Sequence, residues 1–78
     1  MRPGSASVQT PDAAEALAAA RRLSEILLES IGALAGAGEV ETACRLAGQA
    51  CVALRRTDAT AARRFDVLLH RLTPKLTW

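Results

Sequence analysis

The fold of this chain is decided by LAAARRLSEILLESIGAL, residues 17–34. Apolar side chains recur there every three or four residues, which places them on one face of an α-helix, and two later segments have the same period. No segment alternates with the period of two typical of a strand, so the pattern predicts an all-α fold. The three apolar stripes consist of Leu17, Ala20, Leu23, Leu27, Ile31 and Leu34; of Val40, Ala43, Ala47, Ala50, Cys51 and Leu54; and of Ala61, Phe65, Leu68, Leu69 and Leu72.

Residues that start and stop helices set the expected boundaries. Thr10-Pro11-Asp12 supplies a capping hydroxyl, a proline for the first helical position and an acid at the positive end of the helix dipole. Gly36-Ala37-Gly38 is suited to end that helix, Thr57 or Asp58 to cap the third, and Thr73-Pro74 to stop it. We therefore predict a small antiparallel three-helix bundle in one domain, residues 11–73, with helices at about 11–36, 39–56 and 58–72, a disordered arm at 1–10 and a C-terminal tail at 74–78.

The first predicted helix is longer than the two that follow it. At 1.5 Å per residue it spans about 37 Å, against about 26 Å and about 22 Å for the others. Part of its apolar stripe is therefore difficult to cover within one chain, and a domain of this size is marginal without a partner. We expect self-association, or docking to another helical protein, through Leu23, Ile26 and Leu28, and through Trp78 because tryptophan is enriched at the energetic centres of interfaces.

Charge is divided unevenly along the chain. Residues 1–41 carry three arginines and six acids, whereas residues 42–78 carry seven basic residues and two acids. Because the arginine fork matches phosphate and carboxylate, the basic half is an alternative site for a nucleic acid or an acidic partner. Two other interpretations stay open: a solvated face, and complementarity between the two halves within or between chains. The arginines concerned are Arg55, Arg56, Arg63, Arg64 and Arg71.

Residue types that build catalytic or metal sites are few. Cys44 and Cys51 lie seven residues apart, about 10.5 Å along one helix, whereas a disulfide needs Cα atoms within about 7 Å. We expect both thiols to be free and to lie in the core. His70, the only histidine, is expected at the surface. Neither a metal-binding spacing nor a nucleophile beside a base is found, so we expect no metal, no cofactor and no enzymatic activity.

Targeting signals are also missing from the pattern. The segment from Met1 to Val8 has one arginine and no apolar run, and no stretch approaches the roughly 20 apolar residues of a membrane span. We expect a cytoplasmic protein without a membrane contact.

The expected function is that of a non-enzymatic helical interaction module. The chain would associate with itself or serve as the small subunit or adaptor of a larger assembly. The alternative is a nucleic-acid-associated regulatory protein that uses the arginines.

Overall fold

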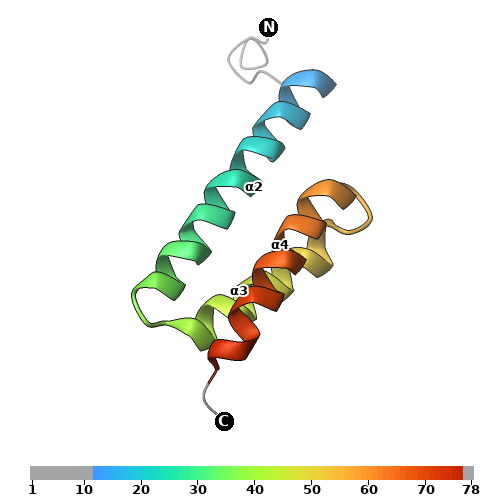
Figure 1. The fold of residues 1–78 in the computed structure, drawn as a ribbon. Helices are drawn as coiled ribbons and strands as arrows, with labels where there is room; N and C mark the ends of the chain where they lie inside the picture. Colours follow the sequence, from blue (N-terminus) through green and yellow to red (C-terminus); the bar gives the residue numbers. More distant parts are fainter. Residues whose placement is uncertain (1–11, 77–78) are drawn as a thin grey trace, which may run out of the picture.

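The computed structural model describes residues 12–76 and has three helices followed by a 3₁₀ turn. Successive helices run antiparallel (Figure 1), and the described residues contain no strand, which confirms the predicted three-helix bundle. The predicted arm at 1–10 and residues 77–78 lie outside the described residues. The elements are α2 (Ala13–Gly36), α3 (Val40–Leu54), α4 (Ala59–Leu72) and η1 (Thr73–Lys75).

Helix α2 begins two residues later than predicted because Asp12 is its cap. The Asp12 Oδ1 accepts a hydrogen bond from the backbone N–H of Glu15 at 2.8 Å, and the Asp12 backbone is extended. This carboxylate satisfies one of the free N–H groups of the first turn and opposes the positive end of the helix dipole. The start lies within two residues of the expected position, about 11, and the expected cap, Thr10, lies outside the described residues.

Glycine ends α2, as the sequence predicted. Gly38 has a φ of 92°, a left-handed conformation that glycine adopts without a side-chain clash. The N–H of Glu39 donates to the carbonyl of Leu34 at 2.9 Å, and the N–H of Gly38 donates to the carbonyl of Ala35 at 3.0 Å. These two bonds form a Schellman motif, which satisfies carbonyl groups at the end of the helix. The short turn brings α3 back along α2 (Figure 1).

The connection between α3 and α4 is equally tight. Helix α3 ends at Leu54 rather than near Arg56, because the N–H groups of Thr57 and Asp58 both donate to the Leu54 carbonyl, at 3.0 and 2.7 Å. Of the two predicted caps, Asp58 is the one used: its Oδ1 accepts a bond from the N–H of Ala61 at 3.1 Å. The cap fixes the start of α4 directly after the turn, so α3 and α4 form a helical hairpin.

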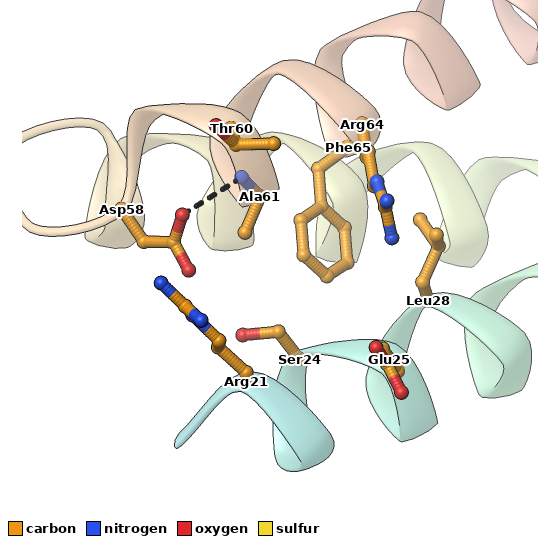
Figure 2. A pocket seen from close by; sticks show the side chains of 9 residues that line it. All are labelled: Arg21, Ser24, Glu25, Leu28, Asp58, Thr60, Ala61, Arg64 and Phe65. Atoms are coloured by element: carbon orange, nitrogen blue, oxygen red, sulfur yellow. Dashed lines mark hydrogen bonds between the residues drawn. The ribbon is translucent and has the colours of Figure 1, made fainter. Parts of the chain in front are cut away.

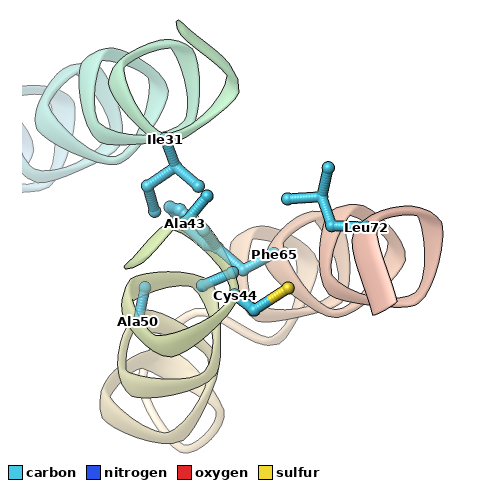
Figure 3. Close-up of a cluster of buried hydrophobic side chains, with 7 residues drawn as sticks. Ile31, Ala43, Cys44, Ala50, Phe65 and Leu72 are labelled. Atoms are coloured by element: carbon cyan, nitrogen blue, oxygen red, sulfur yellow. The ribbon is translucent and has the colours of Figure 1, made fainter. Parts of the chain in front are cut away.

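The core is built from small side chains of α3 and larger ones of its neighbours (Figure 3). Phe65 of α4 and Ile31 of α2 are the largest fully buried residues. The predicted buried faces of the second and third helices are confirmed. Small residues let helix axes approach closely, and α4 packs more extensively on α3 than α2 does on either. Helix α3 contributes the buried residues Ala43, Cys44, Ala47 and Ala50.

Helix α2 is covered only near its C-terminal end. Ile31 is its one buried residue, with Leu28, Leu34 and Ala35 partly buried against the core. Every residue from Ala13 to Leu23 is exposed. As the sequence predicted, part of the apolar stripe of α2 is left exposed by its own chain. The reason is length, because α2 has 24 residues whereas α3 has 15 and α4 has 14.

The C-terminal end continues for one turn beyond α4. The expected tail begins as η1, where the N–H of Leu76 donates to the carbonyl of Thr73 at 3.1 Å. Leu76 is partly buried and packs against the core cluster. The first part of the predicted tail is thus ordered on the bundle, because an apolar side chain docks there.

Candidate interaction surface

Three large apolar side chains lie next to one another on the outside of α2. Leu23 is 65% exposed, Ile26 is 44% exposed and Leu27 is 40% exposed. Their spacing of three and four residues makes them neighbours on the helix surface. Single exposed apolar residues are ordinary, but an adjacent group is typical of an interaction site. We call Leu23, Ile26 and Leu27 the α2 stripe.

Leu28, which was predicted to belong to this exposed group, lies elsewhere. It is partly buried, packs against the core and faces α4. Adjacent residues on a helix point about 100° apart, and the core covers the Leu28 side of α2 more fully than the Leu27 side. The structure places Leu27 on the exposed side and Leu28 on the covered side. Leu17, one of the stripe positions quoted from the sequence, is also exposed but lies further toward the N-terminus.

A first cleft of about 280 Å³ lies between α2 and the start of α4 (Figure 2). Leu28 and Phe65 form its apolar part, and the Arg21 side chain extends from α2 toward Asp58. The side chain of Arg21 is exposed at the edge of this cleft. It precedes Leu28 by seven residues, close to two helical turns, so it shares the side of α2 that faces α4. The cleft is lined by Arg21, Ser24, Glu25, Leu28, Asp58, Thr60, Ala61, Arg64 and Phe65.

A second cleft of about 540 Å³ adjoins the first and runs along α4. Three exposed arginines border an apolar part formed by Leu28, Leu68 and the exposed side chain of Val67. We call it the arginine cleft. Its lining residues are Leu28, Thr60, Arg63, Arg64, Val67, Leu68 and Arg71.

The predicted arginine patch is divided between two places. Arg63, Arg64 and Arg71 come together at the arginine cleft, whereas Arg55 and Arg56 are exposed in the α3–α4 turn and line neither of these two clefts. The division follows from the turn itself, which reverses the chain direction between the two groups. Three arginines on one helix, beside the exposed side chain of Val67, can bind an acidic and amphipathic partner.

Other polar groups are held locally. The Ser24 hydroxyl donates to the carbonyl of Ala20 at 3.1 Å, so its proton is engaged by the helix backbone. Arg22 and Glu25 form an exposed ion pair at 3.3 Å, a type that contributes little to stability. His70 is exposed, as predicted, and its Nδ1 lies 3.5 Å from the carboxylate of Asp66.

Few groups with metal or redox chemistry lie within residues 12–76. No cluster of three or more His, Cys, Asp or Glu side chains there is placed to hold a metal ion. Cys44 is buried, Cys51 is partly buried, and both thiols are free, as predicted. None of the described helices has the length and apolar character needed to cross a membrane. Trp78, the remaining predicted contact residue, lies outside the described residues.

Comparison with protein-family models, with curated proteins and with solved structures finds no match for this chain.

Two features of the surface support a functional interpretation. One is the α2 stripe, an exposed apolar group on a helix whose inner side already packs on the core. The other is the arginine cleft, where positive charge borders an apolar floor.

Proposed function

We propose that this chain is a non-enzymatic helical protein-interaction module that docks through the α2 stripe. Its partner is a second copy of the chain or another helical protein, and the chain serves as the small subunit or adaptor of a larger assembly. The observation that carries this proposal is the group of three adjacent apolar side chains that remain exposed on α2. Hydrophobic association favours covering such a group, and amphipathic helices are common partners for one.

The free energy gained when a partner covers the α2 stripe is large enough to favour docking. Complete burial of a large apolar side chain contributes roughly 1.5–3 kcal/mol, so covering what remains exposed of the stripe contributes about 3 kcal/mol. That is several times the thermal energy of roughly 0.6 kcal/mol, yet micromolar affinity corresponds to about 8 kcal/mol. The stripe is therefore sufficient to direct association, and the rest of an interface has to come from neighbouring surface.

The test replaces two stripe residues by acids. The variant Leu23→Glu with Ile26→Glu is compared with Val52→Glu, which adds a carboxylate at an exposed valine of α3. We expect the wild-type chain to sediment above its 8.2 kDa monomer mass at tens of micromolar, or to crosslink to a helical protein of its host. The stripe variant loses that association and the control keeps it, with circular dichroism reporting unchanged helicity. A wild-type chain that neither associates nor crosslinks would contradict the proposal.

A second candidate function, nucleic-acid-associated regulation, is favoured by the arrangement of Arg63, Arg64 and Arg71 around one cleft. It ranks second because Glu25 and Asp58 line the adjoining cleft, where their carboxylates would repel phosphate. Fluorescence anisotropy with labelled DNA and RNA at low salt tests it. Binding through phosphates weakens steeply as salt rises, and a chain that binds neither nucleic acid at low salt excludes this function.

We also propose a cytoplasmic location. Cys44 and Cys51 are not placed to pair with each other, whereas small domains of oxidising compartments usually depend on disulfides. Fractionation of host cells that express a tagged chain tests this, since recovery from an oxidising compartment would be the contrary result.

A further inference from the structure

We propose that the outer face of α2 binds the same face of a second copy of this chain, with the two helices antiparallel about a two-fold axis. The inference rests on the proposed function and names its partner. In this dimer Leu23 of one copy packs against Ile26 of the other. Because the dimer is symmetric, the same contact occurs twice.

The α2 stripe belongs to a longer repeat that runs along most of the helix. From Leu23 and Ile26, alternating steps of three and four residues lead to alanine or serine in both directions, and every one of these positions is exposed. This spacing is typical of two helices that pack side by side, and small residues let their axes approach closely. The hydroxyl of Ser30 donates to the carbonyl of Ile26 at 2.8 Å, so burial leaves no unpaired donor. We call these positions the seam: Ala16, Ala19, Leu23, Ile26, Ser30 and Ala33.

The seam faces away from the rest of the bundle. Leu28 and Ile31 are side chains of α2 that pack on the core. At 100° per residue, the midline between Leu23 and Ile26 points about 170° from Leu28 and about 110° from Ile31. Helices α3 and α4 lie together on one side of α2 (Figure 1), so a second helix can reach the seam from the other side without displacing either of them.

One register aligns the two helices along their whole length. When Leu23 of one copy lies opposite Ile26 of the other, Ala13 lies opposite Gly36, so both ends of the two helices coincide. The small side chains of one seam then oppose small side chains of the other. A second copy thus supplies an antiparallel neighbour of the full 24 residues, about 36 Å, whereas α3 has 15 residues and α4 has 14.

The two edges of the seam differ, and this difference favours an antiparallel pair. Glu15, Arg22 and Glu29 recur every seven residues along one edge, whereas Ala20 and Leu27 lie along the other. In an antiparallel pair related by a two-fold axis, each edge faces its own counterpart, so charge faces charge and apolar faces apolar. A parallel pair would instead set the charged edge of one copy against the apolar edge of the other.

The charged edge is complementary to itself in the same register. Arg22 of one copy lies about 3 Å along the helix axis from Glu29 of the other. Helical side chains lean toward the N-terminus, so in antiparallel helices these two lean toward each other. Arg22 also forms the exposed pair with Glu25, and the five N–H donors of its guanidinium can serve both carboxylates. The register that aligns the helix ends therefore also pairs opposite charges twice, and this agreement selects a second copy as the partner.

Charge reversal at the edge tests the inference. Arg22→Glu alone sets carboxylates against each other at both contacts, and Glu29→Arg alone does the same with guanidinium groups. We expect each to raise the dissociation constant about tenfold, measured by sedimentation velocity. In an equimolar mixture of the two variants, and in a chain that carries both changes, each contact again pairs opposite charges, so we expect nearly the wild-type affinity. Arg56→Glu, at an exposed arginine in the α3–α4 turn, is the matched control.

Disulfide trapping tests the direction of the helices. Chains with Ala16→Cys should crosslink to chains with Ala33→Cys under mild oxidation, because these positions oppose each other in the proposed register. Chains with Ala16→Cys should not crosslink to one another, because the two copies of this position lie about 25 Å apart along the axis. The wild-type chain, with Cys44 and Cys51, gives the background. Crosslinking between two Ala16→Cys chains above that background would show a parallel pair and overturn the inference.

The outcomes separate the inference from the proposed function. Rescue by the second charge reversal supports the antiparallel dimer and shows that the variants are folded. A wild-type dimer that the Leu23→Glu, Ile26→Glu variant disrupts, but that shows no rescue, overturns the antiparallel register and leaves the interaction module standing. A wild-type chain that stays monomeric at hundreds of micromolar while a helical host protein crosslinks to the stripe overturns the second copy as partner.

Discussion

The α3–α4 hairpin and the first half of α2 are both helical, but different interactions support them. The hairpin buries Phe65 and a row of alanines between its two helices, and Asp58 caps its second helix. The residues from Ala13 to Leu23 touch no core and are all exposed. The comparison shows that an apolar period of three to four residues predicts a helix. How much of the apolar face of that helix is buried depends on the lengths of the helices beside it.

The uncovered half of α2 is nevertheless well suited to form a helix. Six of its first eight residues are alanine, which has the highest helix propensity, and Asp12 supplies the cap. Most helices in proteins owe their stability to packing on an apolar face, as α3 and α4 do. The start of α2 depends instead on local propensity and on continuity with the part that contains Ile31. A helix of this kind presents its apolar side to a partner without a prior change of fold.

The largest expected effect concerns the hairpin core. Phe65→Ala removes the largest fully buried side chain and should lower the free energy of unfolding by about 3–5 kcal/mol. Val67→Ala, two residues away but exposed, should cost less than about 1 kcal/mol. Urea denaturation followed by circular dichroism measures both. Equal costs at the two positions would mean that the hairpin has no dominant core residue.

The next effect concerns the junction between the two regions. Ile31→Ala removes the one buried residue of α2 and should lower the free energy of unfolding by about 2–5 kcal/mol. Ile26→Ala, on the exposed stripe, is the control for the loss of the same side chain. Hydrogen exchange should show the amides of α2 losing protection before those of α3 and α4. If all three helices lose protection together in Ile31→Ala, the two regions form a single cooperative unit.

The next two substitutions change the free energy of unfolding by smaller amounts and in opposite directions. One lies in the α2–α3 turn and the other lies inside α3 of the hairpin. Gly38→Ala should destabilise the chain by about 1–2 kcal/mol, because its φ of 92° is strained for any residue with a Cβ. Gly48→Ala, inside α3, should stabilise it by about 0.5–1 kcal/mol through helix propensity. A Cβ meets no atom within 4 Å at either position, so the backbone alone decides the sign. Thermal unfolding of both variants checks this, and a shift in the same direction for both would contradict it.

The smallest effect compares the two aspartate caps. Asp58→Ala should cost about 1 kcal/mol, because the start of α4 belongs to the packed hairpin. Asp12→Ala removes an equivalent bond from the exposed end of α2 and should cost much less, because that end can unravel while the core stays folded. Urea denaturation measures the difference. A larger cost for Asp12 would show that the first turns of α2 contribute to global stability.

Most of the fold could be predicted from the sequence, because local rules determine it. The apolar periods predicted all three helices, and Gly38 and Asp58 marked two boundaries correctly. The start of α2 could be predicted only to within two residues, because Thr10 and Asp12 are both good capping residues in the sequence and the hydrogen bond from the Glu15 N–H shows that Asp12 caps the helix. The end of α3 could likewise be predicted only to within two residues, because nothing between Leu54 and Arg56 disfavours a helix in the sequence itself.

The candidate site was less predictable because it depends on contacts between distant residues. Leu23 and Ile26 could be placed on the exposed part of α2 from helix lengths alone. The exchange of Leu27 for Leu28 could not be foreseen, since the position of α4 determines which leucine is covered. Likewise, Arg21 meets Arg64 at one cleft although 43 positions separate them in the sequence. Helical spacing from Leu28 could have indicated Arg21, but only after the covered side of α2 was known.

The Schellman turn at Gly38 lies at one end of the long helix α2, so a small rotation there moves the other end of the helix much further. The 24-residue helix is about 36 Å long, so a rotation of about 10° at the turn would displace Ala13 by about 6 Å. No core contact between Ala13 and Leu23 opposes such a swing. The turn at Gly38 and the packing of Leu28 and Ile31 on the core therefore set the spacing between α2 and α4 at the end where α2 begins.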